Sequence, residues 1–318
     1  MGLTIIPVAA VIATKDRATS LARTLDSLAA QGVLPAEVIA VDGSVGDDSR
    51  AVLENWGTKF APQVAVRWQR AEKLGAAIQR NQGITAATQP FIWFFDDDIL
   101  FEPECVSRLW RAMEGDPQLG GVNAMITNQQ YHPPGRVSRM LFTLLHGRRE
   151  RSFAGRLIGP AVNLLPEDRA DLPEVVSVEW LNTGCTIYRR EALPQPPFDS
   201  IFTGYSMMED VTLSVRVGRS WRLANARTAR IFHDSQPGTH KADVRGLAAM
   251  ELVNRHYVMT QVLRRDRWRD FLRLLLWESF QLVVCLTGSA SRAQFPQKLR
   301  GKWQALGQLR SPAIADSK

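Results

Sequence analysis

Short apolar runs alternate with helical patterns over the first 127 residues of the chain. Uninterrupted apolar runs indicate buried strands, whereas apolar residues that recur every three or four positions indicate helices packed on one face. Strands that alternate with helices of this length predict an α/β fold with a doubly wound, mostly parallel sheet flanked by helices. The expected strands are Val8–Ala13, Glu37–Asp42, Val64–Trp68, Phe91–Phe95 and Gly121–Thr127, and the expected helices are Ser20–Gly32, Ser49–Trp56, Gly75–Thr88 and Pro103–Glu114.

The pattern changes in the second half of the chain. Residues 128–178 show no clear periodicity and are rich in Pro, Gly and Arg. In a compact domain such a stretch is typical of a functional or mobile segment. Val178–Arg190 is expected to be a strand with a glycine at its centre, Met208–Ser220 a helix and Trp221–Thr228 a late strand. The rest is almost wholly helical in pattern. We therefore expect a large α/β domain over 1–240, with 128–178 as its variable segment, and a helical appendage over 241–318.

The positive charge of the chain is concentrated in this appendage. The formal net charge is +7, but residues 245–310 hold 12 Lys or Arg against 4 Asp or Glu, which leaves about −1 for the rest. Because the basic residues lie beside bulky apolar ones, an anionic membrane surface is a better candidate partner than nucleic acid.

Residues 264–288 form the most amphipathic part of the appendage. Arg273, Glu278 and Gln281 interrupt the apolar pattern, and an Arg and a Glu in this window count against a bilayer span. Two interpretations stay open: a helix packed on the main domain, or one lying in a membrane interface. The apolar face consists of Trp268, Phe271, Leu272, Leu275, Leu276, Val283 and Leu286.

The cysteines and the N-terminus bear on the compartment. Cys105, Cys185 and Cys285 lie far apart, which fits neither a disulfide framework nor a zinc site. A reducing, cytoplasmic compartment is the simplest expectation, with a peripheral place on the inner face of the plasma membrane if the appendage binds lipid. The apolar N-terminus lacks a basic region before it, so it resembles a first strand more than a signal peptide.

The strongest candidate for chemistry is the run Asp96, Asp97 and Asp98, directly after an apolar strand. Three adjacent carboxylates repel one another unless a cation neutralises them. Carboxylates at strand ends in an open sheet face the ligand, and hard oxygen ligands suit Mg²⁺ or Mn²⁺ that bridges phosphates. The alternative is a solvated acidic loop.

Four other positions carry weaker signals. Asp42 ends the second strand and could bind a base or ribose, or simply form a turn. Arg80 lies in a helix, where it is either solvated or near a diphosphate. Glu209 and Asp210 open a helix, as acids often do for its dipole, but one could be a general base. His233 follows a strand and is either structural or a metal ligand.

Taken together, these motifs resemble the family 2 inverting glycosyltransferases of the GT-A fold. They occur in the family's order and span about residues 8–240, and the ordered set is more specific than any member. The segments that carry the resemblance are Val11–Arg17, Asp42–Ser44, Gly75–Ile84, Phe94–Ile99, Trp180–Arg190 and Met208–Val217.

The resemblance implies roles for the candidate residues. Asp96 and Asp98 match the metal-binding DxD motif, although a run of three aspartates permits two registers and keeps Asp97 as a donor-binding candidate. His233 completes the metal shell, and Asp210, supported by Glu209, is the base. The residues implied to hold the nucleotide or its sugar are Thr14, Arg17, Asp42, Arg80 and Gly184.

The activity implied is metal-dependent, inverting transfer of a hexosyl or deoxyhexosyl group from a nucleotide-diphosphate sugar to a hydroxyl, with residues 1–240 as the catalytic domain. The acceptor is expected to be a lipid-linked or polysaccharide glycan, selected by 128–178, which matches nothing in the family. Two alternatives compete. A nucleotide-sugar pyrophosphorylase would need a glycine-rich loop after the first strand, where Thr14–Arg17 has none. A non-enzymatic, basic membrane-binding module would leave the acidic motifs without a role.

Overall fold

The structure, a computed structural model, describes residues 2–235 and 242–310. The chain divides into two units. Unit 1 comprises residues 1–133, 153–156 and 163–236, and unit 2 comprises 134–152, 157–162 and 237–318. Two stretches of the segment 128–178 therefore belong with the C-terminal residues. The boundary at 240 that the sequence pattern predicts lies outside the described residues.

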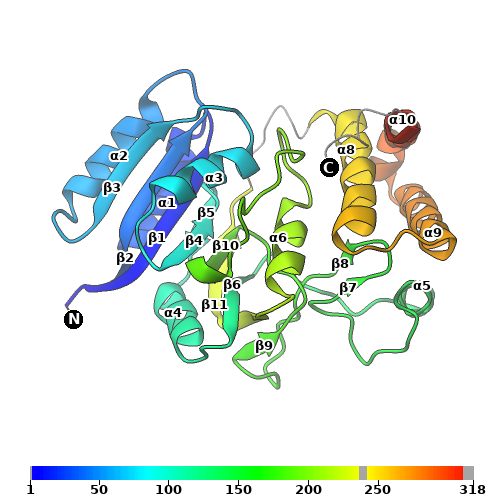
Figure 1. The fold of residues 1–318 in the computed structure, drawn as a ribbon, viewed down its shortest axis with the longest axis horizontal. Coiled ribbons are helices and arrows are strands. Elements are labelled where there is room, and N and C mark those ends of the chain that lie inside the picture. The colour runs from blue at the N-terminus through cyan, green and yellow to red at the C-terminus, as the bar shows by residue number, and fades with distance from the viewer. Residues whose placement is uncertain (1, 236–241, 311–318) are drawn as a thin grey trace. The chain divides into compact units, whose positions relative to one another are not determined.

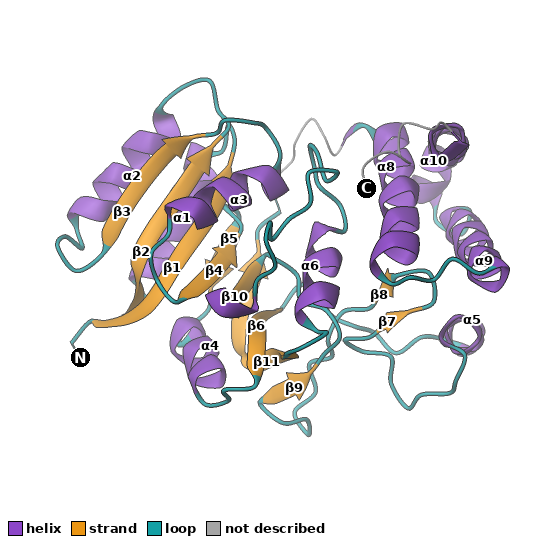
Figure 2. Ribbon diagram, viewed as in Figure 1, coloured by secondary structure: helices purple, strands orange, loops and turns teal. Residues whose placement is uncertain are grey.

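Unit 1 is built on a mixed, mostly parallel sheet (Figure 2). Its strands follow the order β3-β2-β1-β4-β10-β6-β11-β5, and β9 pairs with another part of β11. The pairings make β5, β9 and β10 antiparallel to their neighbours, whereas the others share one direction. The strands are β1 (Thr4–Thr14), β2 (Val33–Asp42), β3 (Ala65–Arg70), β4 (Phe91–Phe95), β5 (Ile99–Phe101), β6 (Leu119–Ile126), β9 (Val175–Ser177), β10 (Cys185–Arg189) and β11 (Arg222–His233).

Helices cover both faces of this sheet. Alternate residues of β1, such as Ile12, join a core cluster that includes Leu25 of α1, Trp56 of α2 and Leu109 of α4. The next residue, Val11, points the other way, toward α3. Burial on both faces explains why the strands are continuous apolar runs. The helices of unit 1 are α1 (Ala18–Ala29), α2 (Asp48–Thr58), α3 (Ala76–Ala86), α4 (Cys105–Glu114) and α6 (Glu209–Val217), with a 3₁₀ turn at Arg190–Ala192.

Some elements differ from the sequence-based expectation. Strands β5 and β9 were not predicted, and β11 continues to His233 instead of ending near Thr228. The prediction of a strand with a central glycine was wrong, because β10 begins after Gly184. The backbone carbonyl of Gly184 accepts a hydrogen bond from the Asp96 amide, so this glycine lies at the end of the β4–β10 ladder.

Unit 2 is mainly helical (Figure 1). One small apolar cluster in it consists of Ala249, Leu252, Met259, Leu274 and Ala305. Among the described residues, no helix combines the length and the apolar character needed to cross a bilayer. The elements of this unit are α5 (Arg136–His146), β7 (Leu157–Ile158), which pairs with β8 (Val162–Asn163), α8 (Val244–Tyr257), a π-helical turn at Val258–Val262, α9 (Trp268–Cys285) and α10 (Ser289–Arg310).

Candidate active site

The ends of three neighbouring strands bring the N-terminal candidates together. Thr14 and Asp42 end β1 and β2 and are directly paired across the ladder. The three aspartates follow β4, which is parallel to β1 on its other side. The carboxyl ends of parallel strands form one edge, where ligands of open α/β sheets bind. The site is therefore confined to this edge of unit 1.

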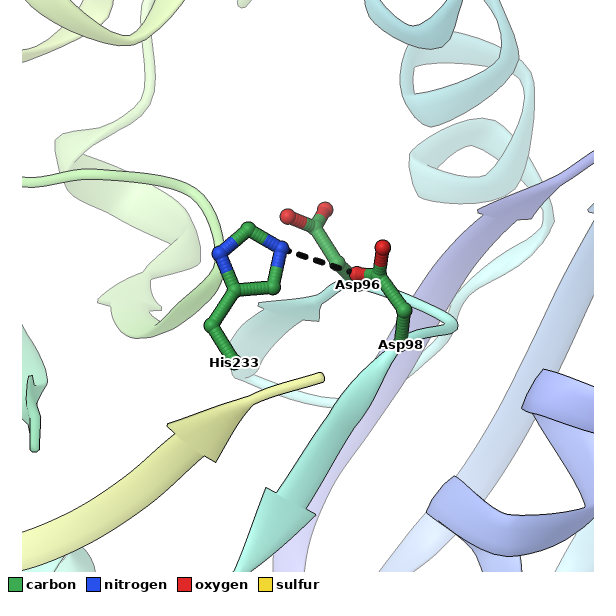
Figure 3. A group of neighbouring side chains, drawn as sticks. All are labelled: Asp96, Asp98 and His233. Carbon is green, nitrogen blue, oxygen red and sulfur yellow. Dashed lines mark hydrogen bonds and ion pairs between the residues drawn. The ribbon is translucent and has the colours of Figure 1, made fainter. Parts of the chain in front are cut away.

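Asp96, Asp98 and His233 form a three-residue cluster (Figure 3). One ligand atom from each lies within 4.8 Å of the others, and His233 Nε2 is 3.1 Å from Asp98 Oδ1. The sheet register explains this meeting. Strand β5 begins immediately after Asp98, and its antiparallel pairing with β11 sets His233 opposite Ile99.

The cluster fits a divalent cation. Two carboxylates and an imidazole are a donor set that Mn²⁺ accepts, whereas Mg²⁺ prefers oxygen alone, and phosphate or water oxygens would complete either shell. The side-chain amide of Gln129 lies 2.8 Å from His233 Nδ1 and orients the ring. With this amide turned so that its Oε1 accepts from Nδ1–H, the Nε2 lone pair faces the cluster, as metal binding requires. Gln129 gave no sequence signal, since it lies in the segment without periodicity.

Asp97 points away from this cluster. Its carboxylate accepts hydrogen bonds from Thr14 Oγ1 at 2.6 Å and from Arg17 Nη1 at 3.0 Å. Arg17 Nη1 also donates to Asp98 Oδ2 at 3.0 Å. Burial raises the pKa of Asp97 to about 6, although the bonds from Thr14 and Arg17 act in the opposite direction. The three consecutive carboxylates thus have different partners, and Asp97 links them to the end of β1.

Arg80 connects the metal cluster to the Glu209–Asp210 pair. It is 5% exposed, and its Nη2 donates to Asp96 Oδ1 while its Nη1 donates to Glu209 Oε1, both at 2.9 Å. A forked guanidinium can hold two carboxylates at a fixed separation, which an ammonium cannot do as rigidly. Asp96, which follows β4, and Glu209 of α6 lie more than 100 positions apart and therefore meet at the guanidinium of Arg80.

Glu209 and Asp210 begin helix α6 and have unequal surroundings. Burial and the adjacent Asp210 charge raise the pKa of Glu209 to about 8, against the effect of Arg80. Burial also raises the pKa of Asp210 to about 6, although its Oδ1 accepts a bond from the Val211 amide at 2.7 Å. The two carboxyls titrate as a pair. Ionising both carboxyls at once is therefore costly, and Asp210 is the more accessible of the two.

Asp42 is fully buried and held by protein groups. Its Oδ1 accepts a bond from the Ser44 amide at 2.8 Å, and its Oδ2 accepts one from Trp68 Nε1 at 3.2 Å. Arg70 stacks on Trp68, with 4.6 Å between the guanidinium carbon and the ring centroid. Sequence reasoning missed Trp68, although an aromatic residue near the end of the third strand could have indicated it.

Gly184 and Tyr205 border the acidic residues. A Cβ built on Gly184 would lie 3.4 Å from Asp96 Oδ2, so a side chain there would crowd the metal cluster. Tyr205 is 46% exposed, and its pKa is raised by partial burial and by the charges of Asp96, Glu209 and Asp98. Sequence reasoning used Tyr205 only as a marker before the helix.

Comparisons with known proteins identify the family and the fold of the chain. Residues 9–193 match the sequence profile described as glycosyl transferase family 2. The fold is similar to that of a mannosyltransferase from Pyrobaculum calidifontis, PcManGT, solved with GDP-Man and Mn²⁺. In that comparison the TM-score is 0.54 and the identity 16%, over 97% of this chain and 77% of the other.

A second similar structure is GalNAc-T7 with UDP, GalNAc and Mn²⁺, with a TM-score of 0.52 and 15% identity. The match covers 73% of this chain and 44% of that one. A search of the curated proteins found no significant match. At these identities the solved structures establish the fold, and the family rests on the profile.

Proposed function

Because the chain belongs to glycosyl transferase family 2 and has the GT-A fold, we propose that it transfers a sugar from a nucleotide-diphosphate sugar to a hydroxyl group, with inversion and with the help of a divalent cation. The observation that carries this proposal is the double ion pair of Arg80. Through Asp96 and Glu209 it joins the metal cluster and the candidate general base in one site. If these acidic groups lay in separate sites, they could not act on one bound donor.

In the proposed reaction, Asp210 takes the proton from the acceptor hydroxyl as its oxygen attacks the anomeric carbon from the side opposite the diphosphate. Its ionised state near neutral pH suits this role. Asp96, Asp98 and His233 would hold Mg²⁺ or Mn²⁺, which supplies positive charge that stabilises the departing diphosphate. Glu209 accepts a hydrogen bond from Arg80, which fixes its distance from Asp96.

The proposed donor contacts lie along the strand ends. The nucleoside is placed beside the ends of β1 and β2, where Thr14 and Asp42 lie; because Asp42 is fully buried, a base reaches it only after the bond from Trp68 Nε1 opens. Arg17 and Asp97 fix the edge of the metal cluster that faces this end. Gly184 leaves room for the sugar beside Asp96. The solved structures of similar fold hold GDP-Man or UDP with Mn²⁺, which supports a nucleotide-diphosphate sugar as donor, and we propose that its sugar is a hexose or a deoxyhexose. We further propose a lipid-linked or polysaccharide glycan as acceptor, and a cytoplasmic reaction.

The test is a panel of nucleotide sugars, with release of the nucleoside diphosphate measured with and without Mn²⁺. Turnover with at least one donor is expected to need the cation. In Asp210→Asn the turnover is expected to fall by at least about a hundredfold, because the base is lost, while donor affinity stays the same. Asp26→Asn, which changes an exposed aspartate of the same unit, is the matched control.

Three results would contradict the proposal. Full turnover of Asp210→Asn would remove this residue from the role of base. Formation of a nucleoside triphosphate and a sugar 1-phosphate from a donor when pyrophosphate is added would instead indicate a nucleotidyltransferase. A product that retains the anomeric configuration of the donor would exclude the single displacement.

A further inference from the structure

Helix α9 of unit 2 carries bulky apolar residues on its outward side as well as on its buried side. Its buried residues are Asp270, Leu274, Trp277, Glu278 and Cys285, whereas Trp268 is 67%, Leu272 54%, Leu275 63% and Val283 60% exposed. A helix of a water-soluble domain normally points apolar residues at the core and charges at water. The successive spacings of four, three and eight positions are close to whole turns, so these residues form one outward stripe along the helix.

Buried charges explain why the exposed apolar residues of α9 point outward. Glu278 forms ion pairs with Lys302 Nζ of α10 at 2.6 Å and with Arg255 Nε of α8 at 3.4 Å. Glu251 of α8 completes the network, since it pairs with both cations at 2.9 Å. Turning α9 to bury its leucines would leave Arg255 and Lys302 without Glu278, which is costly inside a protein. The apolar stripe is therefore fixed outward.

Helix α10 extends this surface. Trp303 is the most exposed tryptophan of unit 2, and Leu299 and Leu306 lie on the same side of the helix. Together with Phe271 and Leu275 of α9, these residues border a groove of about 550 Å³ that is lined mainly by leucines. The groove and the outward stripe make one apolar face, which we call the α9–α10 face.

The charge of unit 2 indicates what covers this face. Unit 2 holds 19 of the 39 Lys and Arg but only 7 of the 32 Asp and Glu, a formal charge of +12, against −5 for unit 1. Two of its seven acids, Asp270 and Glu278, are buried, whereas Arg267, Arg269, Arg292 and Arg300 are exposed. The guanidinium of Arg269 also stacks on Trp268 at 5.4 Å.

We propose that the α9–α10 face rests on an anionic lipid surface, with Trp268 and Trp303 at the level of the headgroups and the leucine stripe among the acyl chains. The apolar residues suit the acyl chains, and the arginines that border them suit anionic headgroups. A second copy of the chain fits less well, because face-to-face pairing would bring two strongly positive units together. The proposal does not depend on the proposed glycosyl transfer.

Flotation of the full chain with vesicles, without donor or acceptor, tests the proposal. Binding is expected to phosphatidylcholine vesicles that contain phosphatidylglycerol, to be much weaker to phosphatidylcholine alone, and to decrease with salt. The variant Leu272→Glu/Leu275→Glu/Val283→Glu is expected to lose at least about tenfold in partitioning, because three charges enter the stripe. Its far-ultraviolet circular dichroism should match the wild type, since all three side chains are exposed.

The matched control puts the same three charges on unit 1, at the exposed Val45, Leu74 and Val175. This variant is expected to keep most of the binding. If both variants lose vesicle binding equally, the loss is explained by net charge and the proposal is overturned. Full binding by the α9 variant, or no binding by the wild type, would also overturn it. A wild-type dimer in light scattering that the α9 substitutions dissociate would instead assign the face to self-association.

Brominated lipids give a second readout. The vesicles should quench part of the tryptophan fluorescence, and Trp268→Phe/Trp303→Phe should remove that part while the vesicles still bind the protein. Quenching that is unchanged in this variant would show that these rings lie outside the bilayer, against the proposal.

Discussion

At the residue scale, three adjacent aspartates have three different sets of partners. Asp96 is held by Arg80, Asp97 by Thr14 and Arg17, and Asp98 by Arg17 and His233. The pattern of the sequence predicted an acidic site but left two registers open, because none of these partners is near the aspartates in sequence. Only the fold brings residues 14, 17, 80 and 233 to the end of β4.

Removing one ligand of the cluster should weaken donor binding only when metal is present. In Asp98→Ala the affinity for the nucleotide sugar with Mn²⁺ is expected to fall by at least about tenfold, because a ligand and the partner of His233 are lost together. Titration calorimetry with and without Mn²⁺ measures this. Without the ion, variant and wild type should bind equally weakly. Unchanged affinity with Mn²⁺ would contradict the metal assignment.

The protonation of Asp210 should set the acid limit of activity. A base acts only when ionised, and burial raises the pKa of Asp210 to about 6. The turnover at saturating substrates should therefore decrease as the pH falls through about 6, whereas a solvent-exposed aspartate would stay active down to about 4. Protonation of the metal ligands would also weaken donor binding, so donor affinity measured at the same pH values distinguishes it from protonation of Asp210. A constant rate down to about pH 5 would argue against Asp210.

At the scale of elements, helix α3 depends on a glycine for its contact with the sheet. A Cβ built on Gly83 would lie only 2.4 Å from Val11 Cγ1 of β1, a buried and branched side chain. The close approach keeps Arg80, one turn earlier, within reach of Asp96 and Glu209. The helix was predicted from its pattern, but this contact was not, because periodicity does not report the distance between a helix and a strand.

Gly83→Ala should destabilise the protein although alanine favours helices by about 1 kcal/mol. The overlap with Val11 is expected to cost about 1–3 kcal/mol, so the free energy of unfolding should decrease by about 1 kcal/mol. Urea denaturation measures it. Adding Val11→Ala removes the overlapping atom, so the double variant should lose less than the sum of the two single changes. An additive cycle would refute the steric explanation.

Strand β5 shows where pattern reasoning failed for an element. Its three residues, Ile99–Phe101, continue directly from the aspartates. A run this short carries no period that separates a strand from a loop. Because β5 was not predicted, its pairing with the end of β11 was not predicted either. The position of His233 beside Asp98 therefore could not be derived from the sequence pattern.

At the scale of the whole molecule, the chain crosses between its two units several times. Helix α5 lies in the segment 134–152, yet it belongs to the same unit as the C-terminal helices. Phe142 of α5 contacts Trp277 of α9, with 6.3 Å between ring centroids. The sequence pattern indicated the mainly helical C-terminal part, but not that an earlier helix joins it, because such membership depends on contacts more than 100 positions apart.

A chain that ends at residue 240 should therefore lose the order of α5. Leu141, Phe142 and Leu145 are buried, and truncation removes Trp277. Trypsin is expected to cut the truncated chain after Arg148, Arg149 or Arg151 much faster than the full chain, because unfolded segments are cleaved preferentially. Mass spectrometry of the fragments locates the cuts. Equal resistance of both chains at these sites would show that α5 folds without the C-terminal helices.

The pairing of His233 with Ile99 also ties cation affinity to the completion of folding. Asp98 and His233 are 135 positions apart, so the last residues of β11 must dock before a three-ligand shell exists. A ligand that recognises only the finished sheet stabilises it by mass action. Mn²⁺ should accordingly raise the melting temperature of the protein, and a chain that stops short of His233 should gain much less from the ion.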